Sequence, residues 1–438
     1  MRGPLHEILR AALAAADAAQ ALHAHVLRRG PSLAMAGRTI DLDACERVVV
    51  LAAGKAAAPM CRAAEEILGD RLTESLAVVP YGYGLDLKRT EIIQAGHPVP
   101  DQAGIEAAQR MLGLAHGLGP RDLTLVLLSG GASALLPAPR PPLTLAHKQA
   151  ATDLLLASGA AIGEINAVRK HLSTIKGGGL ARALAPAATA TLAVSDVIGD
   201  PWDVIGSGPT VADPTTFQDC LDICSSHAIL DRLPWPVRSL LQAGAAGREP
   251  ETLKPGDPCL ATGLHRIILN NAQCLDAAAA KARAMGYATS ILETPLQGEA
   301  RDAAVLLAAK AREAARSGPL PACILAGGET TVTVCGSGTG GRNQELALSL
   351  ALVLEKDPEL RPRLHAACCG TDGRDGTTHA AGAFIGPKTM PLAEDLGLDA
   401  RAMLHANDSH TFFHALGDLI VTGPTRTNVM DLAVLLIA

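Results

Sequence analysis

Aromatic residues are scarce in this chain. Phe, Trp and Tyr make up 2% of its 438 residues, whereas hydrophobic residues of all kinds make up 48%. The core must therefore be built from Ala, Leu and Val, and aromatic platforms for stacked nucleic-acid bases are not expected. The chain also lacks long runs of Lys and Arg, and its formal net charge is −6. These features argue against nucleic acid or an acidic membrane as its main partner.

Long apolar stretches and paired cysteine motifs are missing as well. No apolar run approaches the roughly 20 residues that a helix needs to span a bilayer. The ten cysteines show no CxxC spacing, so neither a zinc site nor a disulfide framework is indicated. We interpret them as buried thiols in a reducing cytoplasm. Charged residues interrupt the alanine-rich N-terminus at helical spacing, which predicts a helix of the fold and not a signal peptide.

The length and the alternation of elements predict two α/β domains. A single compact core rarely grows beyond about 250–300 residues. Buried-type strands alternate with helices throughout, which is typical of an α/β protein. The segment from Asp231 to Asp257 is rich in proline and glycine and marks a candidate boundary. We expect a Rossmann-like N-terminal domain with a mainly parallel sheet over residues 1–245, and a smaller α/β domain over residues 256–438.

The most distinctive stretch runs from Pro321 to Leu350. Cys323 to Ala326 is predicted to be a buried strand, and the Thr/Val alternation of Glu329 to Cys335 predicts a half-exposed one. The glycines of Gly336–Gly341 allow positive φ and close approach to a ligand. The free N–H groups of a helix that begins at Arg342 predict an anion site. A tight strand-to-helix turn with the arginine at its rim is the open alternative.

Two loops of the N-terminal half have similar features. Lys55 follows the predicted strand Arg47 to Ala52, at the strand end where open α/β sheets bind phosphates or carboxylates. The alternative is a lysine that is merely exposed at a helix start. The strand Leu123 to Leu128 leads into the loop Ser129 to Ser133, whose hydroxyls and N–H groups can cradle a phosphate.

Further cations and carboxylates lie near other turns. Arg169 and Lys176 are seven residues apart, which predicts a common, positively charged helix face beside three glycines; a solvated face is the alternative. Asp196 follows a predicted strand and can hold a metal, accept a substrate proton or cap its own loop. Asp372 and Asp375 lie in a glycine-rich turn after another predicted strand and are suited to contacts with Mg²⁺ or a polar substrate.

Taken together, these segments resemble the glycerate 2-kinase family. Its C-terminal module is named MOFRL, and its members are often labelled hydroxypyruvate reductase. The resemblance covers nearly the whole chain. It rests on seven segments in a fixed order, which are Ala53–Ala56, Gly96–Asp101, Ser129–Ala134, Asn166–Ala181, Ser195–Thr210, Pro321–Glu345 and Gly370–Gly376.

The resemblance implies phosphorylation of D-glycerate to 2-phosphoglycerate, with ATP and Mg²⁺ as cofactors, in a cleft between a Rossmann-like and a MOFRL-type domain. The family's active-site pair corresponds to Lys55 and Arg342. We expect Asp196 to orient the hydroxyl that is phosphorylated. The residues expected to bind substrate or nucleotide are Gly54, Ser129, Gly130, Gly131, Ser133, Asn166, Arg169, Lys176, Gly338, Gly340, Gly341 and Glu345, and the expected metal ligands are Asp372 and Asp375. Which glycine loop holds ATP stays open.

The main alternative is an NAD(P)H-dependent hydroxypyruvate reductase. Gly336–Gly341 matches the pattern GxGxxG between a predicted strand and a helix. The dinucleotide fingerprint also requires a carboxylate about 20 residues further on, whereas Asp372 lies about 30 residues on. A non-catalytic sensor of a small acid is a second alternative. We expect a cytoplasmic protein whose partners are glycerate and a nucleotide, and a homodimer is compatible with this prediction.

Overall fold

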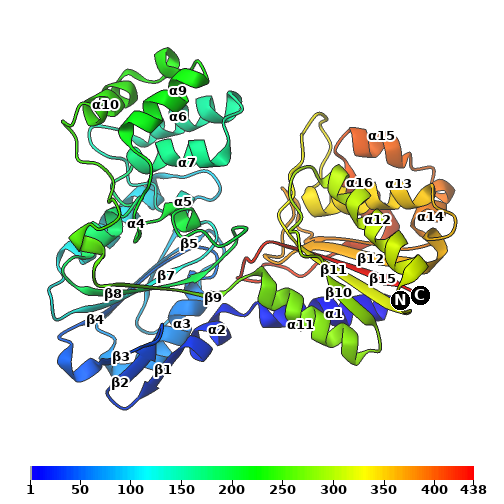
Figure 1. The fold of residues 1–438 in the computed structure, drawn as a ribbon, viewed down its shortest axis with the longest axis horizontal. Coiled ribbons are helices and arrows are strands. Elements are labelled where there is room, and N and C mark those ends of the chain that lie inside the picture. The colour runs from blue at the N-terminus through cyan, green and yellow to red at the C-terminus, as the bar shows by residue number, and fades with distance from the viewer. Residues whose placement is uncertain (1) are drawn as a thin grey trace. The chain divides into compact units, whose positions relative to one another are not determined.

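The computed structural model describes residues 2–438, which form two compact units (Figure 1). The first, here called the parallel-sheet unit, is Ala18–Ile268. The second, the mixed-sheet unit, combines the residues up to Asp17 with Leu269–Ala438. Each unit has a six-stranded sheet of its own, so the predicted α/β class with two domains is confirmed.

The large sheet of the parallel-sheet unit has the strand order β6-β5-β4-β7-β8-β9. The neighbours from β6 to β8 pair in parallel. Strands β4 and β7 are buried along their whole length, which explains why their sequences are continuous apolar runs. The strands are β4 (Val48–Ala53), β5 (Glu74–Pro80), β6 (Glu91–Ala95), β7 (Leu123–Leu128), β8 (Ala188–Val194) and β9 (Gly263–Leu269).

Helices and a small antiparallel sheet complete this unit. A separate hydrophobic cluster around Phe217 joins α6, α7, α9 and α10 into one helical group (Figure 1). The helices are α2 (Ala18–His25), α3 (Ala57–Leu68), α4 (Gln102–His116), α5 (Ala132–Leu135), α6 (Leu145–Ala157), α7 (Ile162–His171), α8 (Gly179–Leu184), α9 (Phe217–Ser226) and α10 (Trp235–Ala245). The small sheet consists of β1 (Val26–Arg29), β2 (Ser32–Met35) and β3 (Arg38–Asp41).

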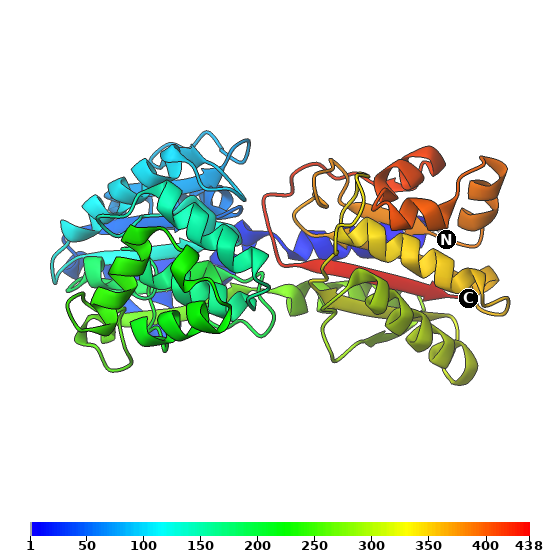
Figure 2. The same ribbon diagram turned by 90° about the horizontal axis from the view of Figure 1, so that it is seen from above.

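The sheet of the mixed-sheet unit has the order β10-β11-β15-β12-β13-β14. Only β10 and β11 pair in parallel. The last strand of the chain, β15, lies between β11 and β12 and runs along the unit as the red arrow of Figure 2. The strands are β10 (Ala288–Ile291), β11 (Ala322–Gly328), β12 (Leu364–Gly370), β13 (Gly382–Ile385), β14 (Leu419–Ile420) and β15 (Asp431–Ile437).

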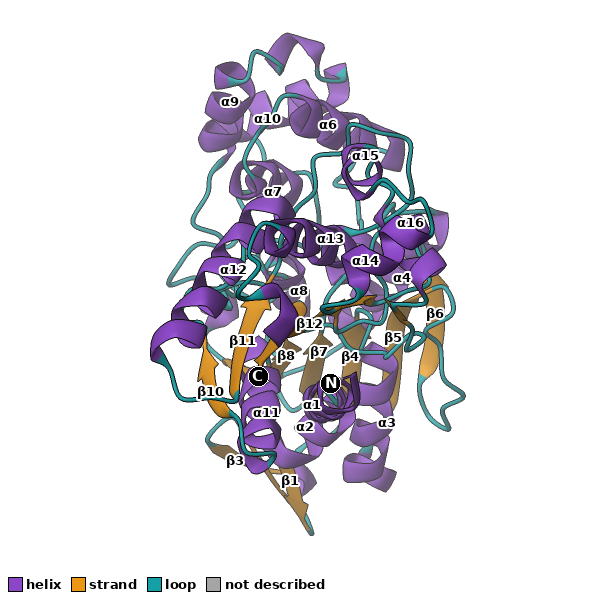
Figure 3. Cartoon of the chain, turned by 90° about the vertical axis from the view of Figure 1, so that its right-hand side faces the viewer, coloured by secondary structure: helices purple, strands orange, loops and turns teal. Residues whose placement is uncertain are grey.

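Helices cover both faces of this mixed sheet (Figure 3). Helices α1 (Arg2–Ala15) and α11 (Asn271–Ala284) pack together on one face. The other face carries α12 (Ala300–Ser317), α13 (Arg342–Glu355), α14 (Thr389–Asp395), α15 (Ala400–His405) and α16 (Ser409–Leu416).

The two units divide the chain at different places from the expected ranges 1–245 and 256–438. The proline-rich segment after α10 lies inside the parallel-sheet unit, because β9 returns to the same sheet. Helix α1 belongs to the mixed-sheet unit, where Leu5 and Ile8 are buried and Glu7 forms an ion pair of 2.6 Å with Lys281. Proline and glycine mark turns whether or not a turn separates two cores, so the composition of this segment does not by itself define a boundary.

Two further expectations concern cysteines and membrane spans. All ten cysteines are free thiols, and seven of them are buried. Within residues 2–438, no helix combines the length and the apolar character that crossing a bilayer would require.

Candidate active site

Lys55 lies on the loop between β4 and α3, and hydrogen bonds join this loop to the loop that follows β7. The Lys55 backbone N–H donates to the Gly130 carbonyl oxygen at 2.9 Å, and the Ala56 N–H donates to the Ser129 hydroxyl at 3.0 Å. Gly54 has a φ of +126°, and a Cβ atom there would lie 2.2 Å from Ser129 Oγ. Only glycine allows this approach. The structure thus brings two of the predicted loops together at the carboxyl edge of the parallel sheet.

The loop after β7 continues into a cluster around Ser133. Gly131 is the N-cap of α5 in a left-handed conformation with a φ of 90°. The Ser133 hydroxyl accepts from Arg169 Nη2 at 2.9 Å and from Lys176 Nζ at 2.9 Å. Lys176 Nζ also donates to the Ser133 carbonyl oxygen at 2.6 Å, and Arg169 Nη1 donates to Asn166 Oδ1 at 3.4 Å. Four residues predicted to bind substrate or nucleotide therefore meet at one place.

The prediction that Arg169 and Lys176 share one helix face is wrong. Helix α7 ends at His171, so Lys176 lies on the turn that follows. The two side chains meet because both reach Ser133, not because of helical periodicity. Lys176 is only 2% exposed, which also rules out a solvated cationic face.

Lys148 on α6 joins this cluster and was not predicted. It is buried, and its Nζ donates to the Pro137 carbonyl oxygen. Burial, together with the charge of Arg169, lowers the pKa of Lys148 to about 7. Burial likewise lowers the pKa of Arg169 and that of Lys176. No carboxylate of residues 2–438 forms an ion pair with any of these three cations.

Arg342, the first residue of α13, is held in place by two carboxylates. Its Nε and Nη2 donate to the two carboxylate oxygens of Asp431 at 2.6 and 3.0 Å, and its Nη1 lies 2.7 Å from Glu329 Oε1. Burial alone would lower the pKa of Arg342, but the charges of Asp431 and Glu329 outweigh it and raise the pKa. Burial raises the pKa of Asp431, against the opposing effect of Arg342. The guanidinium is therefore kept charged and fixed in orientation.

The glycine loop before Arg342 has a different conformation from the expected one. None of Gly336, Gly338, Gly340 and Gly341 has a positive φ. These glycines are instead needed for close packing, since a Cβ atom on Gly338 would lie 2.4 Å from Asp408 Cβ. These glycines thus approach the turn before α16 closely, and their predicted contact with a ligand stays a prediction.

The half-exposed strand predicted for Glu329–Cys335 does not form. Thr331 makes only an isolated bridge to Glu299. The Thr333 hydroxyl donates to Glu299 Oε1 at 2.8 Å, so a side chain takes the place of a neighbouring strand. Strand β11, predicted from Cys323–Ala326, is confirmed.

Asp375 occupies the helix start that the sequence predicts as an anion site. Its carboxylate accepts from the backbone N–H groups of Asn343 and Gln344 at 3.0 and 2.8 Å, and from their side-chain amides at 3.3 and 2.9 Å. Burial raises the pKa of Asp375 to about 6, although these hydrogen bonds oppose the rise. Both oxygens thus accept hydrogen bonds from the start of α13, and the role of Asp375 as a metal ligand stays a prediction.

The remaining predicted acids differ in their surroundings. Glu345 is buried and accepts from Arg301 Nε at 2.8 Å and from Asn407 Nδ2 at 3.0 Å, so it acts as a structural anchor. Asp196 and Asp372 are half-buried and follow β8 and β12 as expected. Among residues 2–438, no group of three or more His, Cys, Asp and Glu side chains is arranged to hold a metal ion.

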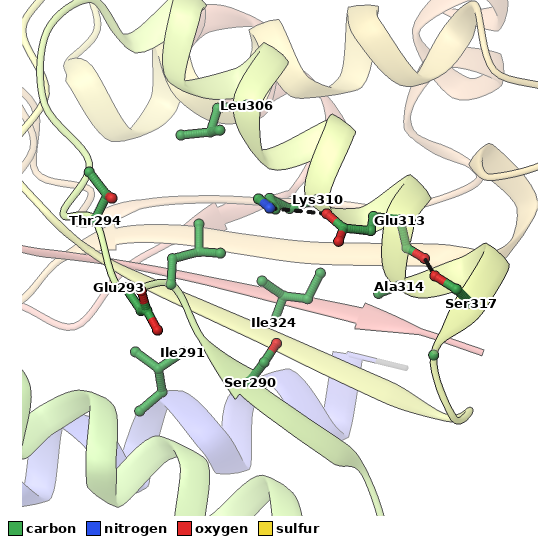
Figure 4. A pocket seen from close by; sticks show the side chains of 12 residues that line it. Ser290, Ile291, Glu293, Thr294, Leu306, Lys310, Glu313, Ala314, Ser317 and Ile324 are labelled. Carbon is green, nitrogen blue, oxygen red and sulfur yellow. Dashed lines mark hydrogen bonds and ion pairs between the residues drawn. The ribbon is translucent and has the colours of Figure 1, made fainter.

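A cavity of about 490 Å³ lies in the mixed-sheet unit between β10 and α12 (Figure 4). Its cation, Lys310, forms an ion pair of 3.0 Å with Glu313, which lines the same cavity. None of the predicted site residues lines it. Since Glu293 lines it as well, this cavity lacks the uncompensated positive charge that marks the cluster around Ser133.

Two protein families match this chain, one in its N-terminal half and one in its C-terminal half. Residues 4–242 match a domain of unknown function, DUF4147, and residues 322–431 match the MOFRL family. The glycerate 2-kinase of Pyrococcus horikoshii is 38% identical over 431 residues, which cover 97% of this chain and 95% of that protein. The chain belongs to the glycerate 2-kinase family.

Other relatives show the range of names in the glycerate 2-kinase family. An Agrobacterium vitis protein, whose name assigns it provisionally as a hydroxypyruvate reductase, is 44% identical over 89% of this chain and 87% of its own. The solved structure of the Thermotoga maritima glycerate kinase superposes with a TM-score of 0.83 at 36% identity, covering 99% of this chain and 98% of that one. The resemblance inferred from seven short segments is confirmed.

Proposed function

We propose that this protein is an ATP-dependent glycerate 2-kinase, which transfers the γ-phosphoryl group of ATP to the 2-hydroxyl group of D-glycerate. The observation that carries the proposal is a pair of cations placed by glycine loops: Lys55 on the loop bonded to Gly130, and Arg342 at the start of α13. Relatives that this chain matches over most of its length are named glycerate kinase or glycerate 2-kinase.

The chemistry of phosphoryl transfer suits these two cations. Charge spreads over the three oxygens of the moving phosphoryl group, so catalysis depends on positioning and on fixed positive charge. Lys55 and Arg342 are the residues that we propose to supply this charge, as the resemblance to the family implies. Asp431 supports this role for Arg342, because its bidentate contact fixes the plane of the guanidinium.

Asp196 is the residue that we propose to orient the glycerate hydroxyl. It follows β8 at the edge of the sheet where the Lys55 loop also lies. A carboxylate in hydrogen-bond reach of a hydroxyl can accept its proton as the phosphoryl group arrives.

Mg²⁺ fits this chain as part of a metal–nucleotide complex. Magnesium is usually held by one or two carboxylates together with substrate phosphates, and no ready cluster of three ligands exists among residues 2–438. Asp372 is the candidate ligand, because the oxygens of Asp375 are already engaged by α13. When bound, Mg²⁺ would neutralise charge on the phosphates.

The reductase alternative rests on the GxGxxG match of Gly336–Gly341. In a dinucleotide site the pyrophosphate lies at the helix start after this motif. Here the Asp375 carboxylate occupies that start, and a Cβ atom on Gly341 would lie 2.3 Å from Asp375 Cγ. A second anion at the same position would be repelled, so the motif does not support a nicotinamide site.

One purified sample can distinguish the alternatives. A coupled assay measures ATP consumption with D-glycerate, and a parallel assay measures NADH and NADPH oxidation with hydroxypyruvate. We expect glycerate-dependent ATP turnover that a metal chelator abolishes, and no comparable oxidation of NAD(P)H. Rapid NAD(P)H oxidation without glycerate-stimulated ATP turnover would refute the proposal, and binding without either reaction would indicate a sensor. A cytoplasmic location, a homodimer and the lack of nucleic-acid or membrane partners stay predictions.

A further inference from the structure

A pocket of about 330 Å³ opens beside Ser133 in the parallel-sheet unit. One part of its wall is cationic and consists of Lys148, Arg169 and Lys176. Another part is apolar and includes Val99 and Leu156, which are 66% and 59% exposed. The pocket therefore joins an anion-binding wall to an apolar rim that is open to solvent.

The cationic wall is not paired with a carboxylate of the protein, and the acid among the lining residues of the pocket, Asp153, is exposed. Arg169 and Lys176 both donate to the Ser133 hydroxyl, and Lys148 donates to a backbone carbonyl oxygen. None of the three pairs with a carboxylate of residues 2–438. Burying cations without a partner is costly, and burial has lowered the pKa of each of them. A bound polyanion would offset this cost.

The apolar rim distinguishes between the two substrates of the proposed kinase. Glycerate has three carbon atoms and a polar group on each, so it could use the cationic wall but would gain nothing from Val99 and Leu156. A nucleotide has phosphates at one end and a flat, largely apolar base at the other, and pockets of this size commonly take ligands of that kind. The same loop also leads back to Lys55, whose N–H is bonded to Gly130, three residues before Ser133.

We propose that this pocket binds the nucleotide, with its phosphates on Lys148, Arg169 and Lys176 and its base against Val99 and Leu156. The inference rests on the proposed kinase function, and it assigns ATP to the loop after β7. Gly338, Gly340 and Gly341 then serve to pack the chain before α13 and not to hold phosphate.

Calorimetric titration of ADP in the absence of glycerate tests the assignment. Lys148→Met removes one buried cation, and Leu156→Glu places a negative charge on the exposed rim, where folding should be unaffected. We expect each variant to weaken ADP binding by about tenfold or more, as for the loss of a charge-assisted hydrogen bond. Lys310→Met is the matched control, because it removes a lysine from the other cavity, and it should leave ADP affinity unchanged.

The outcomes separate this inference from the proposed function. If the wild type binds ADP and phosphorylates glycerate, but Leu156→Glu and Lys148→Met bind ADP normally, the nucleotide lies elsewhere and only the pocket assignment is overturned. The pocket assignment is also overturned if these variants raise the KM for glycerate while their ADP affinity equals that of the wild type. If the wild type neither binds ADP nor consumes ATP, both proposals are overturned.

Discussion

Nucleotide binding should transfer a proton onto Lys148 at pH 8. Burial and Arg169 hold the pKa of this lysine at about 7 in the unliganded protein. Lysine is a base, so above pH 7 its buried side chain is mostly neutral. Phosphates that bind beside it favour the charged form and raise its pKa, which means that binding takes up a proton from the buffer.

The size of the effect follows from these values. With a pKa of about 7, roughly 0.09 of Lys148 is protonated at pH 8. An opposite charge within about 4–6 Å raises a pKa by about 1 to 3, so the bound lysine should be about 0.5 to 0.99 protonated. The expected uptake on Lys148 is therefore about 0.4 to 0.9 protons per site. The nucleotide contributes little, because its terminal phosphate titrates near pH 6 and is ionised at pH 8.

Calorimetric titrations of ADP in buffers with different ionisation enthalpies measure this uptake. The number of protons is the slope of the observed binding enthalpy plotted against the ionisation enthalpy of the buffer. The other ionisable groups that line the pocket are Arg169, Lys176 and Asp153. The pKa of Lys176 is also lowered, so the wild-type value can exceed the share of Lys148. The difference between wild type and Lys148→Met contains that share together with the change in Lys176, whose pKa Lys148 helps to lower. An equal slope in both proteins, with ADP still bound by both, would show that Lys148 takes up no proton when ADP binds.

Three further substitutions test other parts of the account. Lys55→Ala should lower kcat by roughly a hundredfold or more with little change in thermal stability, and a near-normal kcat would contradict its catalytic role. Asp431→Asn should lower kcat by about tenfold or more and leave ADP affinity intact, because it weakens the contact that fixes Arg342 and lies outside the nucleotide pocket. A kcat equal to that of the wild type would show that this contact does not matter for turnover. Gly341→Ala should destabilise the fold by about 2 kcal/mol or more in a denaturant titration, because its Cβ atom would lie 2.3 Å from a carboxyl carbon, whereas Gly113→Ala in α4 has open space and should be neutral or stabilising.

Local sequence patterns predicted the strands better than the domain boundary. Strands β4 and β7 were identifiable because a strand buried on both faces must be apolar throughout. The boundary depended instead on where β9 and α1 pack. The partner of β9 in the sheet is β8, about 70 residues earlier, and nothing in the local composition of β9 shows that pairing.

The candidate site likewise combines residues that a local sequence pattern marks with residues that only long-range packing brings in. The loops that carry Lys55 and Ser133 follow apolar strands with small residues, which is a local pattern. Lys148 and Asp431 have no such mark in the sequence. Lys148 is one lysine in an ordinary helix, and Asp431 meets Arg342 across 89 residues. Their roles became visible only once burial and contact partners were known.

The proposed reaction is the phosphorylation of the 2-hydroxyl group of D-glycerate. The ³¹P NMR spectrum of the product formed from ATP, Mg²⁺ and D-glycerate tests it directly. We expect a new phosphate-ester resonance that the single proton on carbon 2 splits into a doublet. A triplet from the two protons on carbon 3, or no new ester resonance at all, would contradict it.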